Sequence, residues 1–161
     1  MHTNFLFVSI IVLAWHYMSF KIVHDREKSF FYRDNKNYSE KKLLKKEKIY
    51  EVIFKIKLWK DKIPQYVSKN GFSKKNLKSL KINYLKDFIS ETYRAETNHI
   101  LCCLIIPTLF FLSATNVALI ISFLVFLGNI PCIMIQRYNR FRIRRIILKI
   151  NKKNKGDDSK C

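Results

Sequence analysis

The chain alternates between long apolar stretches and strongly basic segments. Residues 1–20 and 100–136 contain no Lys, Arg, Asp or Glu, whereas 21 of the 31 basic residues lie in 21–99 and all the others lie in 137–161. Apolar runs of this length are typical of helices that cross a lipid bilayer. The pattern predicts four segments, namely a transmembrane anchor at 1–23, a basic helical segment at 24–99, a transmembrane hairpin at 100–136 and a basic tail at 137–161.

The first apolar stretch runs from Asn4 to Phe20 and is long enough for one membrane-spanning helix. A cleaved signal peptide is the alternative, and it would begin with basic residues and end at a small-x-small cleavage site. Neither the start of the chain nor the sequence from Phe20 to Val23 has these features. We therefore expect an uncleaved anchor.

The second apolar stretch is too long for one crossing. At 1.5 Å per residue, a single helix of about 37 residues would be about 55 Å long, against a hydrocarbon core of about 30 Å. The polar residues Ser113–Asn116 near its middle are the expected turn. Pro107 lies in one arm and Gly128–Pro131 near the end of the other, which allows kinks or partial re-entry. The sequence thus predicts an all-α integral membrane protein with about three transmembrane helices.

The distribution of charge predicts the orientation of the chain. Basic loops stay on the cytoplasmic side of a membrane. Three spans put both 21–99 and 137–161 on that side, so we expect a multi-pass membrane protein with cytoplasmic basic segments. The net charge of +19 is then best explained by anionic lipid head groups. Nucleic acid is not an expected partner, because no recognition module accompanies the charge.

The basic segment contains two apolar patterns. Residues 24–48 read as a polar connector, after which apolar side chains recur at helical spacing up to Pro64; these are Ile49, Val52, Ile53, Ile56, Trp59 and Ile63. A strand over 52–58 is the alternative, and either form suits an element at the membrane interface. A second helix is expected to begin at Ser73 and to run straight into the second apolar stretch, with a stripe of Leu77, Leu80, Tyr84 and Phe88.

Candidate chemistry lies where this second helix meets the apolar stretch. Glu96 and His99 are spaced as neighbours on one helix face, together with Thr92. A carboxylate can orient an imidazole, and an oriented imidazole can act as a general base. The alternative interpretation is a solvated helix end. A metal site is not expected, because a Glu-x-x-His pair needs further ligands and no second pair is present.

A second polar cluster, 136–142, lies at the exit of the last span. The alternative, non-catalytic interpretation is a basic anchor with an aromatic belt at the membrane surface. A hairpin, however, brings the entrance and exit of the stretch close together, so Glu96 and His99 should approach Gln136–Arg140. A base beside guanidinium groups would make a pocket for an anionic substrate.

Five motifs in this order resemble one family. They are Trp59–Pro64, Gly71–Lys75, Glu91-Thr92-x-Arg94-x-Glu96-x-x-His99, Asn129-x-Pro131-Cys132-Ile133 and Gln136–Arg142. Over about residues 45–145 the chain resembles the glycosyl-4,4'-diaponeurosporenoate acyltransferase family of staphyloxanthin-type carotenoid biosynthesis. The resemblance implies a transferase of the bacterial cell membrane that esterifies the glucose hydroxyl of a glycosylated carotenoid acid with a fatty acyl group, as the last step of that pathway.

On this resemblance we assign roles to the candidate residues. His99 would be the catalytic base and Glu96 its orienting partner, Arg137 and Arg140 would hold the donor phosphate or the oxyanion, and Trp59 would stack on the sugar. Further substrate-binding residues are Glu91, Thr92, Arg94, Gln136 and Asn139. No cofactor is expected; the partners are an acyl donor such as acyl-CoA or acyl carrier protein, a glycosylated carotenoid or other glycolipid acceptor, anionic lipids and other carotenoid-pathway enzymes. The competing hypothesis is a non-catalytic membrane scaffold that uses its basic blocks.

Overall fold

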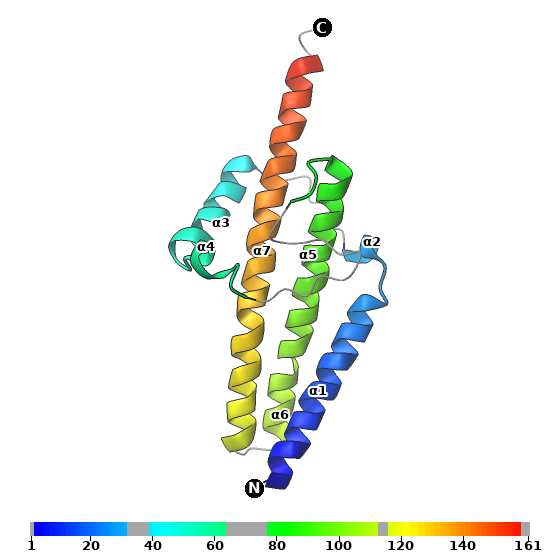
Figure 1. Cartoon of the computed structure of the whole chain (residues 1–161), viewed down its shortest axis with the longest axis vertical. Helices are drawn as coiled ribbons and strands as arrows, with labels where there is room; N and C mark the ends of the chain where they lie inside the picture. The colour runs from blue at the N-terminus through cyan, green and yellow to red at the C-terminus, as the bar shows by residue number, and fades with distance from the viewer. Residues whose placement is uncertain (1, 32–38, 64–76, 113–115, 159–161) are drawn as a thin grey trace. The chain divides into compact units, whose positions relative to one another are not determined.

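A computed structural model describes residues 2–31, 39–63, 77–112 and 116–158. All regular secondary structure in these ranges is helical, as expected. The helices are α1 (His2–His24), α2 (Lys28–Phe31), α3 (Glu40–Val52), α4 (Ile56–Trp59), α5 (Ile82–Cys103), α6 (Ile105–Leu112) and α7 (Asn116–Asp158) (Figure 1). The chain divides into two compact units, Met1–Glu27 with Arg94–Ile133, and Lys28–Tyr93 with Met134–Cys161. Each unit is described by itself.

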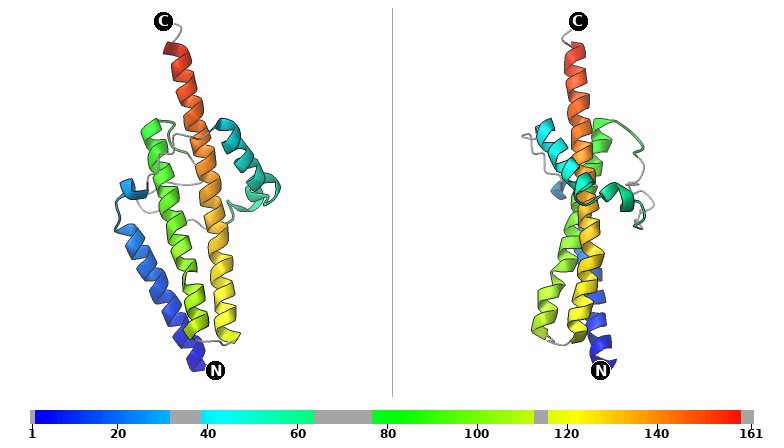
Figure 2. Two further views of the ribbon diagram at one scale, coloured as in Figure 1. Left: turned by 180° about the vertical axis from the view of Figure 1, so that it is seen from behind. Right: turned by 90° about the vertical axis from the view of Figure 1, so that its left-hand side faces the viewer.

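In the first unit, α1, α6 and the start of α7 lie side by side (Figure 2) and pack around one apolar cluster. Its buried members are Val8 of α1, Ile105 and Leu109 of α6 and Ala118 of α7. Of the predicted turn Ser113–Asn116, residues 113–115 lie outside the described residues, and Asn116 is the first residue of α7. The turn therefore stays a prediction.

The expected continuous helix into the apolar stretch is interrupted at Leu104, where α5 ends and α6 begins. Pro107 explains the break, because it has no N–H to donate to Cys103 and its ring clashes with that carbonyl. The carbonyl of Leu101 next to the break accepts the indole N–H of Trp15 in α1, with a nitrogen–oxygen distance of 2.8 Å. A backbone carbonyl beside the break thus accepts a hydrogen bond from a neighbouring helix.

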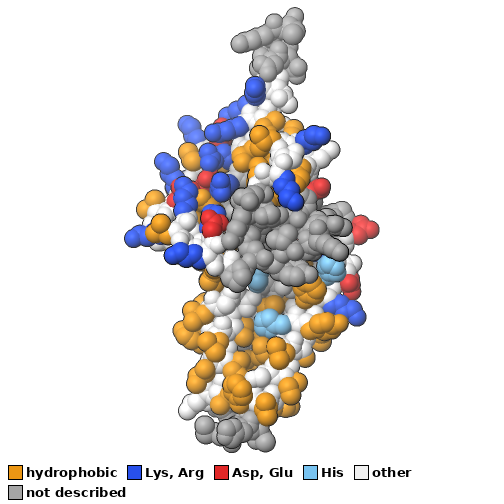
Figure 3. Space-filling view, viewed as in Figure 1, with side chains coloured by type: hydrophobic (Ala, Val, Ile, Leu, Met, Phe, Trp, Pro, Cys, Tyr) orange, Lys and Arg blue, Asp and Glu red, His pale blue; other side chains and the backbone are white. Residues whose placement is uncertain are grey.

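In the part of the chain that the structure describes, two helices, α1 and α7, are long and apolar enough to cross a membrane by length and composition. The arm between them is divided between the end of α5 and the short α6. Large apolar side chains of the first unit are exposed, among them Leu6, Ile10, Leu13, Ile120 and Phe123. Figure 3 shows hydrophobic side chains as an orange surface in the region where Figure 1 draws α1, α6 and the start of α7.

The second unit surrounds the C-terminal half of α7. On one side, Ile143 of α7 packs against Leu85, Phe88 and Ile89 of α5. In a separate cluster, Ile135 and Tyr138 of α7 pack against Ile56 of α4, with Tyr50 of α3 beside them. The helix α7 is thus the common core of this unit.

Three expectations for the basic segment are corrected. The connector expected over 24–48 contains α3 from Glu40 onward, and the helix expected over 49–63 is divided into α3 and α4. Lys55 between them has a left-handed backbone with φ of 47°, and this bend buries Ile56 completely. The strand alternative over 52–58 is wrong, since α3 ends at Val52, α4 covers 56–58, and none of the residues between them forms a strand.

The start of the second helix is also corrected. Ser73 lies outside the described residues, but 77–81 have no regular structure and α5 begins only at Ile82. Leu80 at the expected stripe is exposed, whereas Phe88 is buried. The apolar stripe therefore belongs to α5 only from Tyr84 onward.

Candidate active site

His99 of α5 is bound by Asn129 of α7 within the first unit. The ring Nδ1 of His99 lies 2.9 Å from the side-chain oxygen of Asn129. Asn129 is almost fully buried, whereas His99 is half-buried. The half-buried imidazole of His99 is thus held by a buried side chain of another helix.

The second hydrogen bond of Asn129 determines which tautomer the neutral imidazole of His99 adopts. Its amide nitrogen donates to the backbone carbonyl of Val125 at 2.8 Å. A carbonyl can only accept, so the amide must point its nitrogen there and its oxygen toward His99. Nδ1 of His99 is then the donor, and in the neutral ring the lone pair is on Nε2. This is the tautomer in which His99 can act as a base through Nε2.

Glu96 and Thr92 share the helix α5 with His99, and both are buried. The hydroxyl of Thr92 donates to the carbonyl of Ile89 in its own helix at 2.7 Å. Glu96 stands one helical turn before His99, as the spacing predicted. Its role as the orienting residue of His99 stays a prediction.

Arg94, a predicted substrate-binding residue, contacts the C-terminal end of α1. Its guanidinium donates to the carbonyls of Val23 at 3.2 Å and His24 at 2.6 Å, and lies 2.8 Å from the ring Nδ1 of His24. A cation at a helix C-terminus interacts favourably with the helix dipole. These contacts give Arg94 a structural role, and substrate binding by it stays a prediction.

The second polar cluster lies on α7 in the second unit. Gln136, Asn139 and Arg140 are buried, and Arg137 is exposed. The guanidinium carbon of Arg140 lies 3.8 Å from the ring centre of Tyr93, a close cation–π contact. The side-chain oxygen of Gln136 is buried without a hydrogen-bond partner among the described residues. It is an acceptor that a substrate hydroxyl can satisfy.

The comparisons with known proteins decide the family. Residues 34–149 match the model of the family described as glycosyl-4,4'-diaponeurosporenoate acyltransferase. This chain belongs to that family.

Curated relatives agree with this assignment. The protein of that name from Staphylococcus aureus strain MRSA252 is 29% identical over 108 residues, which cover 65% of this chain and 64% of the relative. Its counterparts from strains Newman and N315 are 28% and 27% identical over the same lengths. The chain thus matches just under two thirds of the length of these acyltransferases. No solved structure matches it.

All ten predicted site residues fall within the region that matches the acyltransferase family. His99 and Glu96 belong to the first unit, and Gln136, Arg137, Asn139 and Arg140 belong to the second. The predicted approach of the two groups stays a prediction. Glu91 is half-buried on α5, and the indole of Trp59 donates to the carbonyl of Phe54 at 2.8 Å.

The sequence interpretation missed several polar contacts of this family member. Tyr93 accepts a hydrogen bond from Arg144 at 2.8 Å, and Glu47 accepts two from Arg145 at 2.8 and 2.9 Å. These pairs link residues far apart in the sequence, so no local spacing could reveal them. Asn129 was visible only as part of a family motif.

A further polar contact fixes the end of α3. Tyr138 donates to Glu51 at 2.8 Å, and Lys57 lies 2.7 Å from the same carboxylate. The Lys57 hydrogen bond, assisted by that of Tyr138, holds the pKa of Glu51 below its usual value, against the opposing effect of burial. Among the described residues, no three His, Cys, Asp or Glu side chains gather as a metal site would require.

Proposed function

We propose that this chain is a membrane acyltransferase that esterifies the glucose hydroxyl of a glycosylated carotenoid acid, the last step of staphyloxanthin-type carotenoid biosynthesis. Membership of the acyltransferase family supports the reaction class. The observation that carries the proposal is the hydrogen bond between His99 and Asn129, because it leaves Nε2 of His99 as a proton acceptor.

In the proposed reaction, Nε2 of His99 takes the proton of the sugar hydroxyl while the hydroxyl oxygen attacks the carbonyl carbon of the acyl donor. The bond between this carbon and the donor's leaving group then breaks, and the imidazolium returns the proton to that leaving group. Arg137 and Arg140 would stabilise the oxyanion or bind the donor phosphate. Acyl transfer then needs no covalent enzyme intermediate.

A membrane location is part of the proposal. Two long apolar helices and the exposed apolar side chains of the first unit support it. Contiguous apolar surface of this kind is rarely exposed to water by soluble proteins. The proposed acceptor, a glycosylated polyene, is itself a membrane lipid, so enzyme and acceptor would share one phase.

The test is an ester-formation assay with the full-length protein in membranes. We expect His99→Ala to lower the rate by about 100-fold or more, since a general base contributes 10²–10⁴-fold. Glu96→Gln is expected to lower it as well. His16→Ala is the matched control, because His16 lies in the same unit and bonds to Val12 of its own helix.

Normal acylation by correctly inserted His99→Ala and Glu96→Gln proteins would contradict the catalytic proposal. It would favour the scaffold hypothesis, under which replacing lysines in 41–62 by Gln would matter more. Comparing the two sets of variants in one assay separates the hypotheses.

A further inference from the structure

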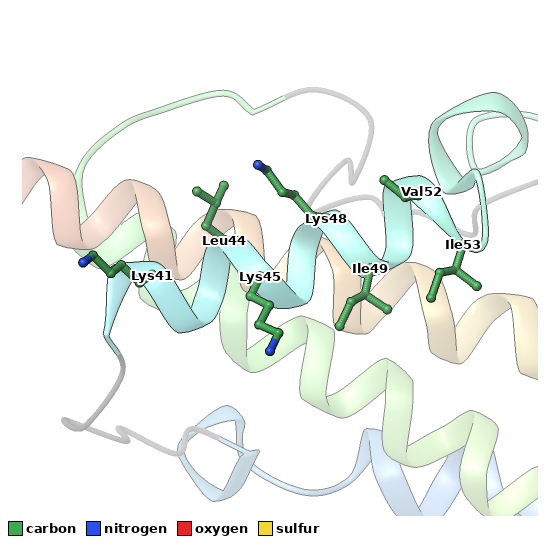
Figure 4. A pocket seen from close by; sticks show the side chains of 7 residues that line it. All are labelled: Lys41, Leu44, Lys45, Lys48, Ile49, Val52 and Ile53. Carbon is green, nitrogen blue, oxygen red and sulfur yellow. The ribbon is translucent and has the colours of Figure 1, made fainter.

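The outer face of α3 combines exposed aliphatic side chains with lysines. A shallow groove along it is lined by Lys41, Leu44, Lys45, Lys48, Ile49, Val52 and Ile53 (Figure 4). At 100° per residue these seven positions fall on one half of the helix. Val52 and Ile53 are 71% and 67% exposed, so the apolar part of the face is not covered by the rest of the protein.

The acidic residues of α3 are all bound on its other side. Glu40 pairs with Lys152 at 2.6 Å, Glu47 with Arg145 at 2.8 Å, and Glu51 with Lys57 at 2.7 Å. The outer face therefore carries positive charge without a carboxylate among its lining residues. The Lys and Arg side chains around α3 form part of the blue surface in Figure 3.

We propose that this outer face of α3 is a docking surface for an anionic phospholipid bilayer. Aliphatic side chains can enter the boundary between head groups and acyl chains, while lysine stems lie along them and bring the ammonium groups to the phosphates. The proposal rests on the membrane location proposed above and not on the acyltransferase reaction.

Charge and shape together favour a lipid surface over an acidic protein. Lysines alone would serve an acidic partner, but the face also exposes Leu44, Ile49, Val52 and Ile53. A chain anchored in a bilayer keeps α3 near lipid at high effective concentration. Each lysine near an anionic surface shifts the docking equilibrium by about fivefold, so the three lysines together shift it by on the order of 100-fold.

The experiment places a photo-reactive amino acid at Val52 of the full-length protein. The protein is reconstituted in nanodiscs of phosphatidylcholine alone or of equal amounts of phosphatidylcholine and phosphatidylglycerol. After illumination, mass spectrometry measures the covalent phospholipid adduct. We expect the adduct to form mainly in the anionic discs, and the triple variant K41Q/K45Q/K48Q to reduce its yield there by about tenfold or more.

The matched control is K78Q/K81Q/K153Q, which removes the same charge from exposed positions outside the face. It should retain the adduct. Equal yields in both kinds of disc, or an equal loss in both triple variants, would overturn the proposal. So would a protein adduct in place of a lipid adduct in native membranes. The comparison between discs uses unaltered lysines, so it remains decisive even if a triple variant fails to fold.

Discussion

At the scale of single residues, the chemistry of His99 depends on a partner distant in the sequence. The amide nitrogen of Asn129 donates to the carbonyl of Val125, and this hydrogen bond fixes the orientation of the amide. Its oxygen therefore faces Nδ1 of His99. A His residue alone would exchange between two tautomers in water, of which only one leaves Nε2 free as a base. The Asn129 amide thus acts as a positioning group for the proposed base.

The positioning role of Asn129 predicts that its substitution lowers the rate of ester formation. We expect Asn129→Ala to reduce the rate of ester formation by about 10-fold, because one neutral hydrogen bond contributes about 0.5–1.5 kcal/mol. Asn129→Asp keeps an acceptor beside Nδ1 and should lose less. Nitrogen NMR of labelled His99 is the second measurement, and it should report a mixed tautomer in Asn129→Ala. An unchanged Nδ1–H tautomer in that variant would contradict the positioning role.

The sequence indicated part of this site and not the rest. Glu96 and His99 are neighbours within one helix, so their spacing was sufficient to place them on one face. Asn129 bonds to His99 across 30 positions, and nothing in local spacing distinguishes it from other polar residues in apolar helices. The contacts of Arg94 with α1 depend on tertiary packing in the same way.

At the scale of elements, carboxylates of α3 attach it to α7. The pair Glu47–Arg145 has two short hydrogen bonds, and Glu47 is 4% exposed. The pair Glu40–Lys152 joins the same two helices, but the lysine side chain is 70% exposed. Solvent weakens the attraction within exposed ion pairs. Breaking a buried pair lowers stability more, because it leaves one charge without its partner.

The two pairs are therefore predicted to differ in their contribution to stability. We expect Glu47→Gln to destabilise the protein by about 2 kcal/mol, a lowering of the melting temperature in detergent by about 5 °C. Glu40→Gln is the matched control, with an expected loss under about 1 kcal/mol. Equal losses in the two variants would refute the argument from burial.

Helix existence was easier to predict than helix ends. Apolar periodicity indicated a helix over 49–63 and another from Ser73 into the second apolar stretch, but α3 and α4 separate at Lys55 and α5 begins at Ile82. The first boundary is set by the burial of Ile56, a tertiary effect that overrides local preference. The break at Leu104 has a local cause in Pro107, whose effect the sequence indicated only as a possible kink.

At the scale of the whole molecule, the separation of apolar and basic segments makes a prediction about the membrane. If basic loops stay in the cytoplasm, Leu80 and Asn151 should face the cytoplasm, and Asn116 at the start of α7 should face outward. Variants with one added cysteine at these exposed positions, made in a Cys161→Ser parent, can be labelled by a membrane-impermeant maleimide. We expect Asn116→Cys to react in intact cells, and Leu80→Cys and Asn151→Cys to react only after lysis. The parent without an introduced cysteine measures reaction at Cys102, Cys103 and Cys132. Labelling of Leu80→Cys and Asn151→Cys from opposite sides of the membrane would contradict this topology. The two basic segments would then lie in different compartments, and His99 could not share a site with Arg137 and Arg140.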